Sequence, residues 1–561
     1  MSSRARLGRL PALVLALGAV GVGACAGGPE ADVEFLCDGW IEVPDEALRA
    51  AVLDRLPVRE DAPEGSVWGR DLLLLEGLAA GGLGIESLEG LQCGQGLRTL
   101  GLGDNEIRSL APLASLRRLE ELEVSGNPLD DLEALRELNE LRSLGLAQTG
   151  RAELDALTGL TRLEGLDVSG NGVRSLMPLA GLRRMQVLGA SDNQLESLEG
   201  LASMNGLVGL SLSRNPLRSL DGVEAATGLR FLDAAECQLS DIEALRNAAS
   251  LEIVDLSANA LTDLSPLAGA TWLLELRVRD NVLESLAPLV GAGPKPVLRF
   301  LEVNSNRLRS LAGCEGLPSL ERLLATANEL TDVTALGDAQ LLREVDLRAN
   351  SSLVDIDALA GVPLLGFLSL GGGAVAPSLD ALAGAPVLQR LQIWDSGPID
   401  LGVAASWPNL ITVDVQRSGF AGDGLSQLAA VTGLQTLLLR EMEVDDIGAL
   451  ASATTLQRLE ITDSGLADVS VLAGFPDLER VDLSGTQVAD LAPLALLEHL
   501  SWVDVQGTQV ASLQALIDNA AFRQGDRART EGSRLDAGDC PQVLELRARE
   551  AVVDVDFDCE G

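Results

Sequence analysis

Leucine and other apolar residues recur along this chain at fixed spacings of two and three residues. From Leu97 to Leu116 they fill positions 1, 4, 6, 11, 14, 17 and 20 of a unit whose position 9 is asparagine, and at Leu119 a new 22-residue unit begins. Neither the 3.6-residue period of an α-helix nor the two-residue period of a strand fits the whole unit. Its first six positions predict a short strand, and the three-residue spacing that follows predicts 3₁₀ or extended turns.

This unit recurs along most of the chain. A regular period of this size predicts a solenoid, in which each unit packs on its neighbours. A lone unit cannot fold, because burying roughly seven side chains at about 2 kcal/mol each does not offset the ~33 kcal/mol cost of ordering its residues. Successive units must therefore join their strands in a parallel sheet. Twenty starting positions can be followed: Leu75, Leu97, Leu119, Leu141, Leu163, Met185, Leu207, Leu229, Leu251, Leu273, Leu298, Leu320, Leu342, Leu365, Leu388, Leu410, Leu434, Leu456, Leu478 and Leu500.

Asparagine is the characteristic residue of the ninth position. Its carboxamide both donates and accepts hydrogen bonds, so we expect it to satisfy backbone groups where the chain leaves the strand. After Asn350 this position holds Gly, Ser, Met or Thr. Because these residues offer fewer hydrogen bonds, we expect a looser ladder there. The structural series is Asn105, Asn127, Asn171, Asn193, Asn215, Asn259, Asn281, Asn306, Asn328 and Asn350.

The unit LxxLxLxxNxLxxLxxLxxL resembles the leucine-rich repeat of the internalin type, over about four-fifths of the chain. The resemblance implies an α/β-type solenoid, a leucine-rich repeat arc with a concave parallel β-sheet, convex 3₁₀ or extended turns and about 20 repeats. A short helical cap is expected at its N-terminal end and a disulfide-bearing cap at its C-terminal end. The segment from Asp45 to Pro57 is similar to the internalin N-terminal helix, because Leu48, Val52 and Leu56 share one face.

The N-terminus has the layout of an export signal. A basic region with three arginines precedes the apolar stretch Leu10 to Val22, which is too short to span a bilayer comfortably. The stretch ends in Val-Gly-Ala-Cys, which resembles a bacterial lipobox and implies acylation of Cys25. An ordinary signal peptide with an incidental cysteine is the alternative. The chain then divides into a lipoprotein signal peptide (1–24), a tether (25–44), a helical cap (45–74), the solenoid (75–521) and a C-terminal cap (522–561).

Six further cysteines follow Cys25. Cys540 and Cys559 flank the last strand-like segment, so we expect a disulfide, which an exported location permits. A second bridge between Cys37 and Cys93 would tie the N-terminal cap to the first repeats. The remaining two cysteines lie three repeats apart, about 14 Å, which is beyond disulfide reach, so we expect buried free thiols.

Composition argues against catalysis and against nucleic acid. The 83 acidic residues against 42 basic ones give a net charge of −41, which phosphate backbones would repel. His499 is the only histidine and precedes a strand, so histidine-rich metal sites are impossible and a triad is disfavoured. We therefore predict no enzyme activity, no cofactor and no metal site.

The candidate binding surface comes from positions 3, 5 and 7, which point away from the leucine core. These positions are small in the early repeats and bulky from the eighth repeat on, with acids alongside at position 5. Outward aromatic residues with arginine are typical of protein interfaces, although aromatics could also pad a curved sheet or mark a slipped register. The proposed partner-binding residues are Phe231, Arg277, Phe300, Arg322, Arg348, Phe367, Arg390 and Trp394.

Two functions remain from the sequence. The first is a protein- or peptide-binding scaffold that its acyl chains alone hold at the bacterial cell envelope. Ala26 after the anchor favours the outer membrane or the cell surface. The alternative is a structural or adhesive surface protein that binds polysaccharide. Carbohydrate grooves usually need a line of aromatic platforms, whereas here the aromatics are few and mixed with arginine, which favours a protein ligand.

Overall fold

The computed structural model describes residues 37–559, so the expected signal peptide and Cys25 lie outside the described residues. The chain divides into unit 1, which ends at Asn281, and unit 2, which begins at Val282. Each unit is built from short repeats with one strand apiece. None of the described helices has the length and apolar character needed to cross a membrane.

Unit 1 opens with a cap of one two-stranded antiparallel sheet and two helices. The Asp45 carboxylate accepts the backbone N–H of Leu48 at 2.9 Å and starts the first helix, whose Leu48 and Val52 are fully buried. This helix ends at Leu53, before Pro57, and Leu56 is only partly buried. It is therefore shorter than the sequence suggested, and the antiparallel pairing of the two strands that flank it was not foreseen. The elements are β1 (Trp40–Glu42), α1 (Glu46–Leu53), β2 (Ser66–Trp68) and α2 (Gly69–Leu72).

A parallel sheet follows in unit 1. Its register places position 3 of each repeat beside position 3 of the next, as in the pairing of Phe231 with Ile253. A slipped register is thereby excluded at these strands. The strands are β3 (Gly77–Ala79), β4 (Thr99–Gly101), β5 (Glu121–Glu123), β6 (Ser143–Gly145), β7 (Gly165–Asp167), β8 (Val187–Gly189), β9 (Gly209–Ser211), β10 (Phe231–Asp233), β11 (Ile253–Asp255) and β12 (Glu275–Arg277).

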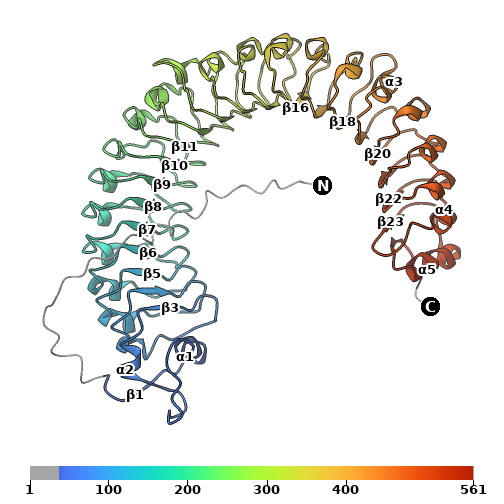
Figure 1. Cartoon of the computed structure of the whole chain (residues 1–561). Helices are drawn as coiled ribbons and strands as arrows, with labels where there is room; N and C mark the ends of the chain where they lie inside the picture. Colours follow the sequence, from blue (N-terminus) through green and yellow to red (C-terminus); the bar gives the residue numbers. More distant parts are fainter. Residues whose placement is uncertain (1–36, 560–561) are drawn as a thin grey trace. The chain divides into compact units, whose positions relative to one another are not determined.

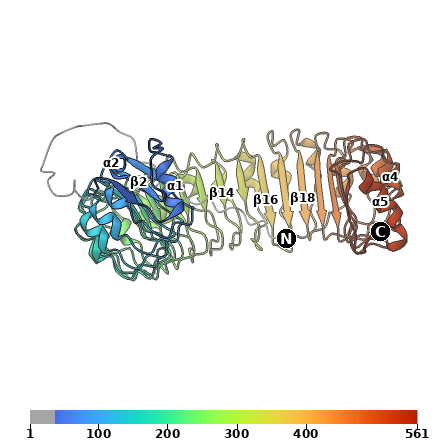
Figure 2. The same cartoon turned by 90° about the horizontal axis from the view of Figure 1, so that it is seen from below.

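Unit 2 holds a second run of parallel strands, which lie side by side and point the same way in Figure 2. Its last two strands come from the segment after Ala521 that the sequence assigned to the C-terminal cap. The strands are β13 (Phe300–Glu302), β14 (Arg322–Leu324), β15 (Glu344–Asp346), β16 (Phe367–Gly371), β17 (Arg390–Trp394), β18 (Thr412–Gln416), β19 (Thr436–Arg440), β20 (Arg458–Thr462), β21 (Arg480–Asp482), β22 (Trp502–Asp504), β23 (Arg527–Arg529) and β24 (Val552–Asp554).

Short helices, mostly 3₁₀, form the opposite side of the repeats. Within each unit taken by itself, the strands line the concave side and these helices the convex side (Figure 1). In unit 1 they are η2 (Leu91–Cys93), η3 (Ala111–Ser115), η4 (Glu133–Glu137), η5 (Asp155–Leu157), η6 (Met177–Leu179), η7 (Glu199–Leu201), η8 (Glu243–Leu245) and η9 (Ser265–Gly269). In unit 2 they are η10 (Ala287–Val290), η11 (Cys314–Gly316), η12 (Thr334–Leu336), η13 (Asp357–Gly361), η14 (Asp380–Leu382), η15 (Ala404–Ser406), α3 (Gly424–Ala429), η16 (Gly448–Ser452), η17 (Ser470–Gly474), η18 (Ala492–Leu496), α4 (Gln514–Asp518), η19 (Ala537–Asp539) and α5 (Cys540–Ala548).

The asparagines of position 9 lie inside the repeats and bond the backbone on both sides. Asn127 is fully buried, and its Nδ2 donates to the carbonyl oxygens of Leu102 and Val124, both at 2.9 Å. Its Oδ1 accepts the N–H of Ile107 at 3.0 Å. One carboxamide therefore links two repeats and ends the strand of its own repeat.

Strand length follows the residue at position 9. Strands β16 to β20 have five residues, and their ninth positions are Gly373, Ser396, Ser418, Met442 and Ser464. In repeats with asparagine, the Nδ2 of this side chain donates to the carbonyl oxygen of position 6. Where position 9 has no such donor, this carbonyl can accept a backbone N–H of the next strand. Where no side chain competes, the strand gains two residues. The backbone ladder is therefore longer in these repeats, and the looseness expected after Asn350 stays a prediction.

The acids at position 5 also have a backbone role. Asp233 accepts the N–H of Ala235 at 3.2 Å, and Asp255 accepts that of Ser257 at 2.9 Å. The N–H two residues beyond the acid is left without a strand partner wherever the strand stops after three residues. The carboxylate supplies the missing acceptor. These acids therefore stabilise the short strands and are not free for recognition.

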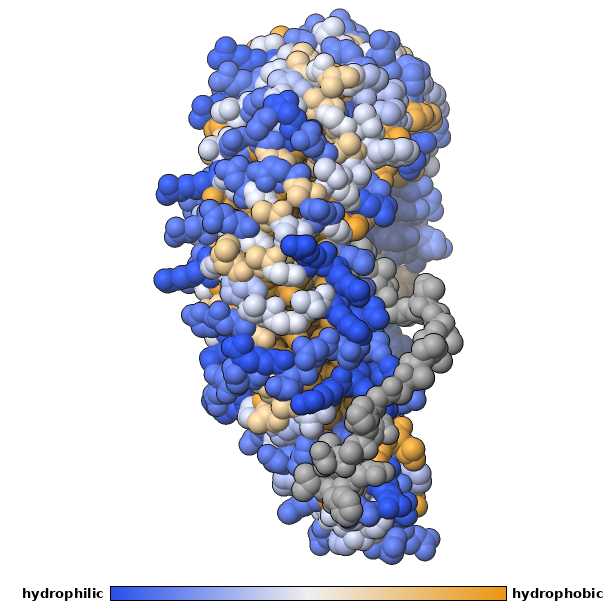
Figure 3. Space-filling model, turned by 90° about the vertical axis from the view of Figure 1, so that its left-hand side faces the viewer, coloured by the Kyte–Doolittle hydropathy of each residue, from blue (hydrophilic) through white to orange (hydrophobic). Residues whose placement is uncertain are grey.

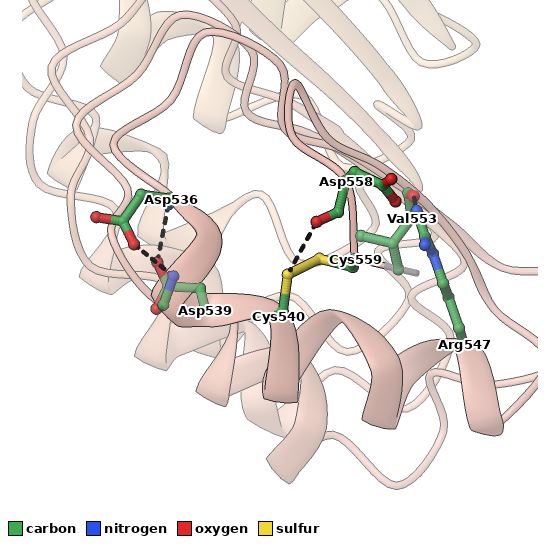
Figure 4. Close-up of a disulfide and its surroundings, with 8 residues drawn as sticks. Asp536, Asp539, Cys540, Arg547, Val553, Asp558 and Cys559 are labelled. Carbon is green, nitrogen blue, oxygen red and sulfur yellow. Dashed lines mark hydrogen bonds between the residues drawn. A yellow bond between two sulfur atoms is a disulfide. The ribbon is translucent and has the colours of Figure 1, made fainter. Parts of the chain in front are cut away.

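The end of unit 2 is closed by α5, β24 and a disulfide (Figure 4). Cys540 at the start of α5 is bonded to Cys559, which confirms the expected C-terminal bridge. Arg547 of α5 donates to the carbonyl of Val553 at 2.9 Å. β24 pairs only with β23 among the described residues, so this bond satisfies a carbonyl on its outer edge.

The other cysteines are arranged as follows. Cys37 is bonded to Cys93, which joins the cap to the first repeats of unit 1. Cys237 and Cys314 are buried free thiols. Burial raises the pKa of the Cys237 thiol to about 11 and that of Cys314 to about 12. Neither thiol ionises near neutral pH, so both are inert core residues.

Candidate functional site

The concave surface of unit 1 carries few bulky side chains over strands β6 to β9. Positions 3, 5 and 7 of β6 to β9 carry mostly glycine, serine and alanine. The first aromatic residue of the sheet is Phe231, where the Arg230 guanidinium lies 5.4 Å from the ring centroid and is paired with Glu252 at 2.7 Å. At the end of the unit, Arg277 is paired with Glu275 at 2.8 Å.

Unit 2 places aromatic rings and guanidinium groups on neighbouring strands of its concave surface. Arg322 of β14 lies 4.9 Å from the ring centroid of Phe300 on β13, and its Nε donates to Glu344 at 2.6 Å. Arg390 of β17 lies 5.7 Å from the ring centroid of Phe367 on β16. Cation–π pairs of this kind contribute about 0.5–1 kcal/mol at exposed sites.

A third pair joins two repeats that are not neighbours. The Arg348 guanidinium lies 4.2 Å from the ring centroid of Trp394, and the strand between them carries Gly371 at the same position. Gly371 has φ of +135°, and a Cβ there would lie 1.7 Å from the carbonyl oxygen of Trp394. Glycine is thus required at 371, and its missing side chain lets Arg348 reach the indole. The Arg348 guanidinium is held by two hydrogen bonds to the Asp346 carboxylate, from Nε at 2.9 Å and from Nη2 at 2.6 Å.

Carboxylates at position 5 form a buried row beneath these side chains. Asp414 is 3% exposed and Glu460 is 7% exposed. Arg440 bridges the two, at 3.0 Å from Asp414 and 2.7 Å from Glu460. Asp504, at 2% exposed, is paired with Arg529 at 3.0 Å. The side chains of these arginines are more exposed than those of the acids they pair with. The groups that face solvent here are therefore guanidinium rather than carboxylate.

Burial changes the pKa values of this row. Desolvation raises the pKa of Asp414 and Asp482, and that of Asp504 to about 6, where the charge of Asp482 adds to the rise. Glu460 is desolvated too, but hydrogen bonds and charge from Arg458 and Arg440 bring its pKa below the usual value. Asp504 is therefore the acid of this row that titrates nearest to neutral pH.

One further pair on this surface was not predicted. The Arg480 guanidinium lies 4.8 Å from the ring centroid of Trp502 on the next strand. Both residues stand at position 3, so the rule that selected Phe300 and Phe367 would have found them had it been carried past Trp394.

The structure brings together six of the eight predicted partner-binding residues as three pairs within unit 2, while Phe231 and Arg277 belong to unit 1. The register of unit 2 excludes a slipped strand, since Phe300 pairs with Arg322 and Phe367 with Arg390. The rings are half-buried, so part of each pads the sheet and part reaches solvent. His499 lies in an exposed turn before β22.

The convex side of unit 1 looks different. Figure 3, which shows the left-hand side of Figure 1, presents this side as largely hydrophilic, with apolar residues scattered over it. Its exposed apolar side chains include Met177, at 55% exposed, on a 3₁₀ helix. Scattered single apolar residues are normal on a soluble surface. The paired aromatic and arginine side chains of unit 2 therefore remain the better candidate site.

Comparisons with known proteins agree with this architecture. A family model of leucine-rich repeats (two copies) matches residues 95–137. The chain is a leucine-rich repeat protein. No curated protein matches it.

Solved internalin structures from Listeria monocytogenes are similar to this leucine-rich repeat protein. Internalin InlF is 25% identical with a TM-score of 0.54, covering 58% of this chain and 95% of InlF. Internalin C2 is 31% identical with a TM-score of 0.34, covering 42% and 93%. The functional domain of InlJ, which includes a cysteine ladder, is 18% identical with a TM-score of 0.47, covering 82% and 80%. The predicted fold class, a leucine-rich repeat solenoid with a disulfide-bearing C-terminal cap, is confirmed.

Proposed function

We propose that this leucine-rich repeat protein is an exported, lipid-anchored binding protein that holds a protein or peptide ligand on the concave surface of unit 2. The observation that carries the proposal is the set of three arginine–aromatic pairs, Arg322 with Phe300, Arg348 with Trp394 and Arg390 with Phe367. Aromatic and arginine side chains are the residues that most often dominate binding energy at protein interfaces. Phe231 and Arg277 form a separate candidate contact in unit 1.

A protein ligand fits these pairs better than a polysaccharide does. Sugars bind aromatic residues by stacking on an open ring face. In unit 2 each of these rings already has a guanidinium 4.2 to 5.7 Å from its centroid. A peptide can contact the same pairs through carboxylate, backbone carbonyl and apolar groups, because guanidinium offers several donors in one plane.

The location proposed rests on two features. Disulfides persist in exported proteins, and two are present here. The lipobox-like sequence that ends at Cys25 supports an acyl anchor in the bacterial envelope. A binding role without catalysis is consistent with the exposed turn that holds His499, far in sequence from the three pairs that carry the proposal.

The test replaces Phe300, Arg322 and Phe367 together by alanine. Capture of a partner by crosslinking on intact cells should be lost, while the melting temperature changes by a few degrees at most, because these side chains are only partly buried. Leu496→Ala, at a residue 73% exposed on η18, serves as the control and should capture normally. Normal capture by the triple variant contradicts the proposal, and glycan binding lost in that variant supports the polysaccharide alternative instead.

A further inference from the structure

Arginine is concentrated at position 3 of unit 2, in a chain that has twice as many acids as bases. Across the strands β13 to β24 this position holds one acid, Glu344, against five arginines. The other acids of the same strands stand at position 5. The arginines at position 3 are Arg322, Arg390, Arg458, Arg480 and Arg527.

Two of these arginines differ from the others in their partners. Arg322, Arg458 and Arg527 are bonded to Glu344, Glu460 and Asp554. Arg390 and Arg480 are exposed and lie over the rings of Phe367 and Trp502, and within residues 37–559 neither makes an ion pair with a carboxylate.

The buried acids nearby do not neutralise these two groups. Asp414 is held by Arg440, and Asp504 by Arg529, both at 3.0 Å. Glu460 is shared by Arg440 and Arg458. Each of these carboxylates has its own arginine within the sheet, whereas Asp482, on the same strand as Arg480, accepts the backbone N–H and the hydroxyl of Ser484 and, in the part of the chain that the structure describes, makes no ion pair with Arg480. The guanidinium groups of Arg390 and Arg480 are therefore available to an anionic ligand.

Spacing restricts the ligand. β17 and β21 are four strand spacings apart, about 19 Å, and an extended peptide covers that distance in about six residues. The half-buried hydroxyl side chains of Thr412 and Thr436 lie at position 3 between them and offer neutral hydrogen bonds.

We propose that unit 2 binds an acidic peptide in extended form across β17 to β21, with one carboxylate on Arg390 and a second, about six residues away, on Arg480. Carboxylate and guanidinium match in geometry, and charge-assisted bonds are roughly twice as strong as neutral ones. Phe367 and Trp502 hold the two guanidiniums in place from beneath. This inference rests on the proposed function and names the chemical class of its ligand.

The test measures fluorescence anisotropy of a labelled oligoglutamate peptide of about ten residues, long enough to reach both arginines. The same peptide with glutamine in place of glutamate is the neutral probe, and oligogalacturonate is the glycan probe. The double variant Arg390→Gln, Arg480→Gln should lose about tenfold or more in affinity for oligoglutamate. Arg309→Gln, at a side chain 82% exposed and outside position 3, is the matched control and should bind as the unmodified protein does.

Three results overturn the inference. The first is that the glutamine peptide binds as tightly as oligoglutamate, and the second is that the double variant keeps full affinity for oligoglutamate. The third is that oligogalacturonate binds through Arg390 and Arg480 while oligoglutamate does not bind. Its failure is separable from that of the proposed function. If oligoglutamate does not bind but the triple alanine variant still abolishes partner capture, the concave surface binds a ligand that is not acidic. If the triple variant captures normally, the proposed function itself is wrong.

Discussion

Thr486 donates its hydroxyl hydrogen to the carbonyl oxygen of Leu483 at 2.6 Å, and the strand of that repeat ends at Asp482. Thr508 makes the same bond to Val505, and its strand also has three residues. In the five repeats before them position 9 makes no such bond in the described structure, and the strands have five residues. In these repeats a hydroxyl donor at position 9 thus accompanies the shorter strand.

The first prediction concerns the asparagine series. Asn127→Ala should lower the free energy of unfolding by about 3 kcal/mol, because two buried carbonyls and one amide lose their partner. Urea unfolding followed by circular dichroism measures the change. Asn139→Ala, at an exposed asparagine, is the control and should stay within about 0.5 kcal/mol of the unmodified protein.

A second prediction concerns the C-terminal bridge. Replacing Cys540 and Cys559 together by serine removes a cross-link over a sequence separation of 19 residues, and should cost about 3 kcal/mol. Because the bridge fastens α5 to the end of the chain, the loss should appear as faster amide exchange in β23 and β24 before the rest of unit 2. Unchanged exchange in these strands would show that α5 holds the end without the bridge.

The third prediction is a pH dependence at Asp504. Its pKa of about 6 lies above the usual 3.8, so the folded state binds more protons than the unfolded state between these values. The stability associated with the protonated acid is therefore present below about pH 4 and is lost as the pH rises through 6, by up to about 3 kcal/mol. Asp504→Asn removes this loss.

The measurement compares melting temperatures of Asp504→Asn and the unmodified protein from about pH 5 to about pH 8. The difference should shift in favour of the variant as the pH rises. Asp468→Asn is the matched control: the backbone and side chain of Ser470 lower the pKa of Asp468, so its difference should stay flat over this range. A flat line for Asp504→Asn would show that Asp504 is already ionised at the lower pH.

The fourth prediction concerns the anchor. Cys25→Ser should abolish labelling of the protein by an alkyne fatty acid in cells and release it from the membrane fraction, since serine cannot form the thioether. Export and both disulfides should be retained. No labelling of the unmodified protein would mean that the cysteine is incidental and that an ordinary signal peptide precedes it.

The repeats could be predicted in detail because the inward leucines occupy the same positions in every repeat. The strand register at Phe300 and Phe367 follows from this common spacing. Strand length could not be predicted. The sequence does not show that the carbonyl of position 6 can accept a hydrogen bond either from the asparagine side chain or from a backbone N–H of the next strand. The pairing of Arg348 with Trp394 was also missed, since it depends on the absent side chain of Gly371 in the strand between them. The Arg480–Trp502 pair was open to the positional rule but was not sought.

The central claim is that the concave surface of unit 2 is where a ligand binds, and photo-crosslinking tests it most directly. A benzophenone amino acid is placed at Phe367 on the concave surface or at Leu496 on the convex helix η18, and intact cells are irradiated. We predict one discrete protein adduct from position 367 that disappears when Phe300 and Arg322 are replaced by alanine, and none from position 496. An adduct from position 496 alone, or one from position 367 that survives those replacements, would contradict the account.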